Sequence, residues 1–143
     1  MENKSPSVFS GKHSELTGRI LNCFFKVHAN LGYGFAEKVY QRALMLELIK
    51  SGLVVVEQKP IQVYYDGEIV GEFFADMVVN NLIILELKSV RQILDEHISQ
   101  LLNYLKSTHY EIGLVLNFGP KPTHERKVFD NERKGSLVWM SRN

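Results

Sequence analysis

The spacing of hydrophobic residues changes near Gly52, and this change limits the chain to a fold that combines helices with a sheet. Before Gly52, apolar residues recur every three or four positions. That spacing predicts helices over residues 14–31, with Ser14 as a good N-cap, and over residues 35–50. After Gly52, apolar and polar residues alternate, which is typical of strands.

The alternating region divides at turn-forming residues. Pro60, Asp66-Gly67 and Asn80-Asn81 separate expected strands over residues 53–58, 61–65, 68–79 and 82–88. A third helix is expected over residues 91–107, followed by an apolar strand over 113–118 of the kind that is covered on both faces. A short final hairpin of residues 128–129 and 137–140, around Lys134-Gly135, is also expected. The prediction is an α/β fold of the α+β type, with helices packed on a mixed sheet.

Composition agrees with one globular domain. The chain has 143 residues, of which 45% are hydrophobic and 23% charged. We therefore expect a single domain over residues 14–143 after a flexible stretch at residues 1–13. The one cysteine, Cys23, excludes an internal disulfide and a multi-cysteine zinc site, and its place on an apolar helix face indicates a core residue.

Charge and hydropathy narrow the expected partners. The net charge of +1 argues against a highly basic protein that coats nucleic acid. No apolar run approaches the roughly 18 residues that span a bilayer, and the first ten residues lack a secretory apolar segment. A cytoplasmic location without a membrane partner is expected.

Three charged residues occur where apolar residues are expected. Asp76 interrupts an apolar strand, while Glu86 and Lys88 alternate with Leu87 and so project from one face. One interpretation is structural, with Glu86 and Lys88 as an ion pair and Asp76 capping a backbone group. The other is a hydrolytic site, in which two carboxylates hold Mg²⁺ and an ammonium group neutralises charge on a phosphate.

The strand register distinguishes these interpretations. A two-residue loop at Asn80-Asn81 would pair Asp76 with Leu85 and leave Glu86 on the other face. A three-residue loop, or a bulge, would bring Asp76 opposite Glu86. The metal-site hypothesis therefore predicts the odd offset.

Two helices carry further candidates. Glu37 heads a partly apolar stripe with Gln41, so it is either a partner of the helix dipole or an inward-facing ligand. Gln100 and Tyr104 are four residues apart on the third helix. They would either contact a substrate phosphate or form a solvent-facing polar edge.

The motifs together resemble the GxxExxY protein family over about residues 14–129. Gly34, Glu37 and Tyr40 match its named positions, and the later matching segments are Ala75-Asp76, Leu85 to Lys88, Gln100 to Leu105 and Gly113 to Gly119. That family is placed in the PD-(D/E)xK nuclease-like superfamily. The resemblance implies a restriction-endonuclease-like αβββαβ core with an extra N-terminal helix.

The same resemblance implies roles for individual residues. Asp76, Glu86 and Lys88 would carry the active-site motif, with Ala75 standing where the superfamily name has proline. Glu37 would be the helix-borne acid. Gln100 with Tyr104 is similar to the QxxxY motif of RecB-type nucleases.

The expected function is therefore a nuclease that uses magnesium or manganese. Asp76, Glu86 and Glu37 would bind the metal together with the main-chain carbonyl of Leu87, and Lys88 would position water or stabilise charge. Gln100 and Tyr104 would hold the scissile phosphate or steady Lys88.

Two alternatives remain open. One is a catalytically silent module of the same fold that binds nucleic acid or a partner protein, and the other is a purely structural acid–base cluster. A homodimer is compatible with the exposed sheet edge. Residues 121–143 hold six basic and three acidic side chains, and these predict a phosphate-facing flank made of Lys121, Arg126, Lys127, Arg133 and Lys134.

Overall fold

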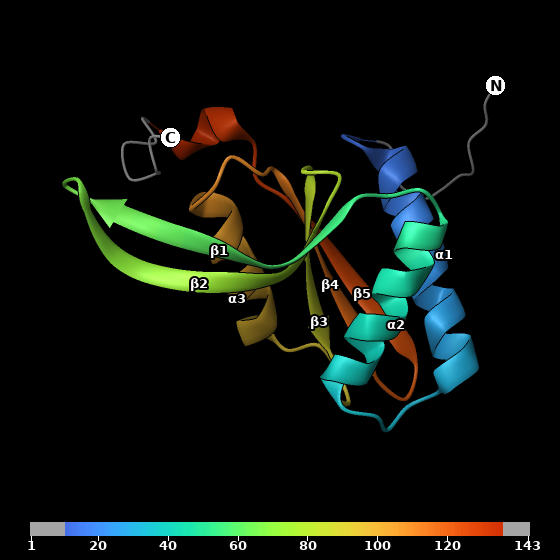
Figure 1. Cartoon of the computed structure of the whole chain (residues 1–143). Helices are drawn as coiled ribbons and strands as arrows, with labels where there is room; N and C mark the ends of the chain where they lie inside the picture. The colour runs from blue at the N-terminus through green and yellow to red at the C-terminus, as the bar shows by residue number, and fades with distance from the viewer. Residues whose placement is uncertain (1–10, 136–143) are drawn as a thin grey trace.

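The computed structural model describes residues 11–135, which form a five-stranded mixed sheet with helices on both faces. Figure 1 shows two adjacent helices on one face and the third helix on the other. The elements in chain order are α1 (Ser14–Leu31), α2 (Glu37–Lys50), β1 (Val55–Tyr65), β2 (Glu68–Val79), β3 (Ile83–Lys88), α3 (Asp95–Lys106), β4 (Ile112–Phe118), β5 (Pro122–Val128) and the 3₁₀ helix η1 (Asn131–Lys134).

The strands lie in chain order across the sheet, from β1 to β5. Among the strands of residues 11–135, only β3 and β4 are parallel, because α3 crosses between them, and the other neighbours pair antiparallel. The predicted αβββαβ core is confirmed as α2 to β4, with α1 as the extra N-terminal helix. No helix within residues 11–135 is both long and apolar enough to cross a membrane.

The sheet separates two hydrophobic cores. One lies under α1 and α2, where Phe24 and Leu44 are fully buried against residues such as Leu85 and Leu116. The other lies under α3, where Leu101 packs with Ile84 and Val115. The strands β3 and β4 are buried on both faces as a result, as their continuous apolar runs predict.

Two strand predictions were wrong. Residues 53–58 and 61–65 were expected as separate strands, but β1 runs unbroken through Pro60 because β1 is an edge strand and an edge position tolerates the missing N–H. The strand β5 was not predicted, because its sequence is strongly polar. It forms the other edge of the sheet, where Glu125 is exposed and Arg126 and Lys127 are half-buried.

The predicted final hairpin was also wrong in its described part. Val128 ends β5, and residues 131–134 form η1 instead of a turn between strands. Its second strand, at residues 137–140, lies outside the described residues, as do residues 1–10 of the expected flexible N-terminus. Lys12 lies within the described chain, and its ammonium group contacts Glu111 at 3.1 Å and Asp130 at 2.9 Å.

Candidate active site

The strands β2 and β3 separate beside Asp76 and Glu86. Their regular pairing ends at Met77 and Leu85, and beyond that pair two carboxylates take the place of backbone acceptors. The Asp76 N–H donates to Oε2 of Glu86 at 3.2 Å, and the Leu87 N–H donates to Oδ2 of Asp76 at 2.8 Å. Each acid is therefore bonded to the strand that carries the other.

The register is the odd one that the metal-site hypothesis requires. Val79 pairs with Ile83, which leaves a three-residue connection at residues 80–82. Asn80 and Asn81 both adopt positive φ, at 52° and 54°, a conformation that asparagine tolerates better than most residues. This connection brings Asp76 level with Glu86 across the two strands.

Burial raises the pKa of both carboxyl groups. Only 3% of Glu86 is exposed, and burial followed by repulsion from Asp76 raises the pKa of Glu86 to about 8. The pKa of Asp76 is also raised, mainly by burial, although the hydrogen bond from Leu87 lowers it. The charge of Glu37 raises the pKa of both acids. The site therefore concentrates negative charge in a place that disfavours it.

Lys88 continues the polar site toward α3. It is the last residue of β3, and its Nζ donates to Oε1 of Gln100 at 3.4 Å. Nε2 of Gln100 in turn donates to the Tyr104 hydroxyl at 3.1 Å. Burial raises the pKa of Tyr104 to about 12, so this hydroxyl keeps its proton at neutral pH. Gln100 and Tyr104, four residues apart on α3, thus form a chain of hydrogen bonds with Lys88.

Glu37 approaches from the opposite face of the sheet, at the first turn of α2. The loop before it is fixed by Tyr40, which is fully buried and stacks on Phe118 with ring centroids 4.4 Å apart. The Tyr40 hydroxyl donates to the Gly32 carbonyl at 2.6 Å and accepts from the Phe35 N–H at 3.2 Å. Gly32 has a positive φ of 71°, which suits glycine. Tyr40 is therefore a structural residue that supports the position of Glu37.

Asn117 is a further residue that supports the site and was not predicted from the sequence. It is fully buried, and its side-chain amide accepts from the Val90 N–H and donates to the Val90 carbonyl, both at 3.0 Å. Gly119 closes the same contact, because an added Cβ would collide with the Val90 carbonyl oxygen. These residues fix the loop that follows Lys88. The sequence feature that could have indicated this role is that Asn117 is a polar residue within the apolar run of β4.

The donor set suits a hard divalent cation. Asp76 and Glu86 offer carboxylate oxygens, which are ligands that Mg²⁺ prefers, and Mg²⁺ is commonly held by one or two carboxylates with substrate phosphates completing its shell. Within residues 11–135, no three His, Cys, Asp or Glu side chains are grouped as a metal site. Glu37 therefore influences the carboxylate pair through its charge without forming a three-carboxylate cluster with it.

The predicted basic flank is not one continuous surface. Lys134 is buried, and its Nζ donates to the carbonyls of Thr108 at 2.8 Å and Tyr110 at 2.7 Å. Its charge stabilises the loop between α3 and β4, so its assignment to the outer flank was wrong. Arg126 and Lys127 lie on β5, whereas Arg133 lies on η1 beside Phe129.

A structural comparison supports the fold. An alkaline exonuclease from Laribacter hongkongensis superimposes with a TM-score of 0.51 at 12% sequence identity, over 90% of this chain and 76% of that chain. At this identity the likeness concerns the fold. A comparison with curated proteins finds no match.

A sequence comparison identifies the family. The model of the PD-(D/E)XK nuclease superfamily matches residues 14–129, which include every element from α1 to β5 and all of the candidate site. Nucleases of this superfamily generally use divalent metal ions. The predicted superfamily is therefore confirmed: the chain belongs to the PD-(D/E)XK nuclease superfamily.

Proposed function

We propose that this protein is a metal-dependent nuclease that hydrolyses phosphodiester bonds of nucleic acid. One observation carries the proposal: the carboxylates of Asp76 and Glu86 meet where β2 and β3 separate, next to Lys88 on the same strand. A purely structural cluster would gain little from two buried acids that repel each other. A divalent cation would remove that repulsion.

In this proposal, Asp76 and Glu86 would hold Mg²⁺ or Mn²⁺, with the main-chain carbonyl of Leu87 as a further ligand. Glu37, which forms no three-carboxylate cluster with them, would contact a water molecule bound to the ion. The bound ion supplies positive charge that activates water and offsets the charge of the phosphate. Lys88 orients the attacking water and stabilises the added negative charge on the phosphoryl oxygens. Hydrolysis adds hydroxide to phosphorus, breaks one P–O bond and delivers a proton to the leaving oxygen.

Gln100 acts on this chemistry through Lys88, whereas Tyr104 fixes Gln100 and offers its own hydroxyl to the substrate. The contact from Lys88 to Gln100 limits the positions of the ammonium group, and the bond from Gln100 to Tyr104 fixes the amide. Since the Tyr104 hydroxyl accepts from Gln100, its own hydrogen remains able to contact a substrate phosphate. We therefore assign Gln100 as a positioning residue and Tyr104 as a substrate contact.

We also infer membership of the narrower GxxExxY family. Its three named positions act together in this chain, since Tyr40 fixes the loop that contains Gly34 and leads into Glu37. This cooperation gives the motif a physical reason that is independent of sequence similarity.

The decisive experiment is a cleavage assay with single-stranded, duplex and branched substrates in Mg²⁺, Mn²⁺ or EDTA. We expect cleavage by the wild-type protein with either ion and none with EDTA. Lys88→Met should abolish cleavage while circular dichroism stays unchanged. Lys50→Met is a suitable control, because Lys50 is an exposed residue at the far end of α2.

Two results would contradict the proposal. Nucleic-acid binding without cleavage under any ion would favour the catalytically silent module. Equal Mg²⁺ or Mn²⁺ binding by the wild type and Asp76→Ala in calorimetry would remove the metal site and favour the structural cluster.

A further inference from the structure

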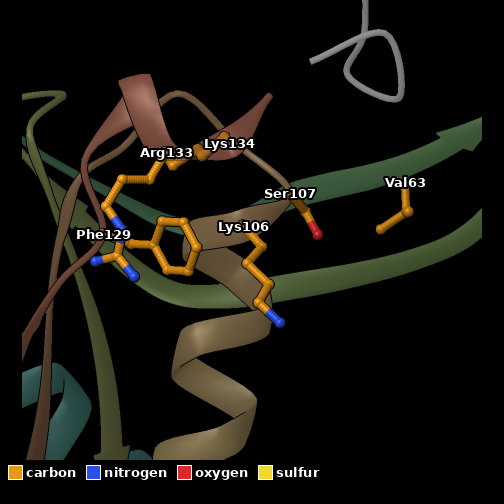
Figure 2. A pocket seen from close by; sticks show the side chains of 6 residues that line it. All are labelled: Val63, Lys106, Ser107, Phe129, Arg133 and Lys134. Carbon is orange, nitrogen blue, oxygen red and sulfur yellow. The ribbon is translucent and has the colours of Figure 1, made fainter. Parts of the chain in front are cut away.

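A cavity lies at the C-terminal end of α3, away from Lys88. It has a volume of about 330 Å³ and is lined by Val63, Lys106, Ser107, Phe129, Arg133 and Lys134. Figure 2 shows Lys106 and Ser107 at the end of α3, with the Arg133 side chain extending to the Phe129 ring. Three of the six lining residues are cationic, and none of them is acidic.

The positive side chains of this cavity counteract the negative partial charge that the end of α3 would create there. The C-terminal end of a helix carries partial negative charge, which repels anions. Here Lys106 is the last residue of α3, and Lys134 donates to the carbonyls of Thr108 and Tyr110 just beyond it. These cations more than offset the helix end, so the cavity favours an anionic ligand.

Two of the three cationic side chains of the cavity are free to contact a ligand from solvent. Lys106 and Arg133 are both exposed, whereas Lys134 is buried against carbonyl groups. The Arg133 guanidinium lies 4.9 Å from the centroid of the Phe129 ring, which holds it at the cavity wall. A planar guanidinium held in this way can bond two oxygens of one phosphate.

Both walls of the cavity continue to the candidate active site. On α3, Gln100, Tyr104 and Ser107 follow one another at spacings of four and three, so they share one face of the helix. On the facing hairpin, Phe73 contacts Tyr104 with ring centroids 5.6 Å apart. Phe73 pairs with Ile61, and Val63 lies two residues further along the same face of β1.

We propose that this cavity binds a backbone phosphate of the nucleic-acid strand whose scissile phosphate lies at Lys88. This inference rests on the proposed nuclease function and adds the path of the substrate. Lys106 lies six residues after Gln100, or about 9 Å along the helix at about 1.5 Å per residue. A stacked strand rises about 3.4 Å per nucleotide, so the two phosphates would be roughly three nucleotides apart.

The test measures binding without cleavage. Anisotropy of labelled 16-nucleotide oligodeoxythymidylate and oligouridylate would be recorded in EDTA over a range of salt concentrations. We expect Lys106→Ala/Arg133→Ala to weaken binding about tenfold. The slope of log K against log salt should also fall by about 0.7 for each phosphate that the variant no longer neutralises. Lys106→Glu, a single change at an exposed helix position, should weaken binding at least as much.

The matched control is Lys26→Ala/Lys50→Ala. It removes two charges from α1 and α2, on the opposite side of the sheet, where both lysines contact Glu47. Its affinity and salt slope should equal those of the wild type. Equally weakened binding in both double variants would mean that only overall charge matters, and this would overturn the proposal.

Two further outcomes separate the possible sources of the phosphate and the two proposals. If inorganic phosphate raises the melting temperature of the wild type while Lys106→Ala/Arg133→Ala binds both oligonucleotides normally, the cavity takes free phosphate and the strand proposal fails. If the double variant loses binding but the wild type cleaves no substrate, the cavity assignment holds and the nuclease proposal fails.

Discussion

At the scale of single residues, the candidate site holds two neighbouring acidic side chains in a buried environment that is unfavourable for their charge. Glu86 is almost fully buried next to Asp76, and the nearby charge of Lys88 lowers the pKa of both acids by less than burial raises it. Such clusters of shifted pKa values are typical of functional sites. The cost of the cluster should be measurable as a dependence of stability on pH.

The free energy of unfolding of the metal-free protein should fall as pH rises from about 4.5 to about 8. In this window folded Glu86, with its pKa of about 8, keeps a proton that the unfolded chain, with a pKa of 4.5, releases. Unfolding therefore releases a proton, and higher pH favours it. Glu86→Gln carries no titrating group, so its stability should decline less between these pH values.

Urea denaturation in EDTA at pH 5, 6.5 and 8 would measure this difference. Glu132→Gln is a control for general loss of an acid, because Glu132 is exposed on η1. Parallel pH curves for the wild type and Glu86→Gln would contradict the burial cost assigned to Glu86.

At the scale of elements, the site depends on two connections that contain no candidate ligand, the loop before Glu37 and the loop after Lys88. Tyr40 fixes the loop between α1 and α2, and Asn117 fixes the loop after β3. The hydroxyl of Ser89 also donates to the Phe35 carbonyl at 3.0 Å, which joins the two loops. Residues far from the chemistry should therefore alter it.

Asn117→Ala should lower the free energy of unfolding by about 2–4 kcal/mol. The change leaves the N–H and the carbonyl of Val90 without their side-chain partner. Each buried group left unpaired costs about 1–3 kcal/mol, and the lower half of that range applies because Val90 is half-buried. Denaturant titration measures the decrease, and Asn103→Ala on the exposed side of α3 serves as a control. A decrease within the range typical of surface substitutions, about 0.5 kcal/mol, would mean that the loop does not depend on Asn117.

Tyr40→Phe should lower the free energy of unfolding by about 1–2 kcal/mol, since the change removes two hydrogen bonds to the loop while the ring can still stack on Phe118. Tyr33→Phe is a matched control in the same loop, because Tyr33 is 45% exposed. We expect the control to unfold like the wild type, and equal effects of the two changes would contradict the role given to the Tyr40 hydroxyl.

Most elements could be predicted because their hydrophobic spacing is strong. The pair β3 and β4 is an example, since both are apolar runs buried on two faces. The strand β5 could not be predicted in the same way, because an edge strand needs no apolar face and its pairing with β4 is decided by the backbone. The sequence likewise could not indicate that Lys134 turns inward, because its acceptors are main-chain carbonyls.

The site was more predictable than the edges of the sheet. Asp76, Glu86 and Lys88 were conspicuous because charge is rare inside apolar strands. The spacing of Gln100 and Tyr104 also indicated correctly that they are neighbours. The hydrogen bond between Lys88 and Gln100 could not be predicted from the sequence, because the two residues lie on different elements.

At the scale of the whole molecule, the sheet links the two acids proposed to bind the ion to the stability of the whole fold. Ion binding to the folded state alone should stabilise the protein by about 2.7 kcal/mol at a concentration about 100 times the dissociation constant. We therefore expect Mn²⁺ or Mg²⁺ to raise the melting temperature of the wild type at pH 8, and EDTA to reverse the shift.

Asp76→Ala should show no such shift, whereas Asp95→Asn should respond like the wild type because Asp95 lies exposed at the start of α3. Differential scanning fluorimetry with each ion would measure both variants. Equal shifts in the wild type and Asp76→Ala would show that the ion stabilises the protein from elsewhere.

The separation of β2 and β3 implies a trade-off between stability and activity in this protein. Two acids occupy positions where ordinary β-residues would let the strands continue to pair, so a chain without them is free to close the gap with backbone bonds. Selection for heat resistance alone should then favour apolar replacements at Asp76 and Glu86, and under the proposed function the more stable protein would not cleave nucleic acid. Under the proposed function, retention of both acids in a population would therefore indicate selection for cleavage.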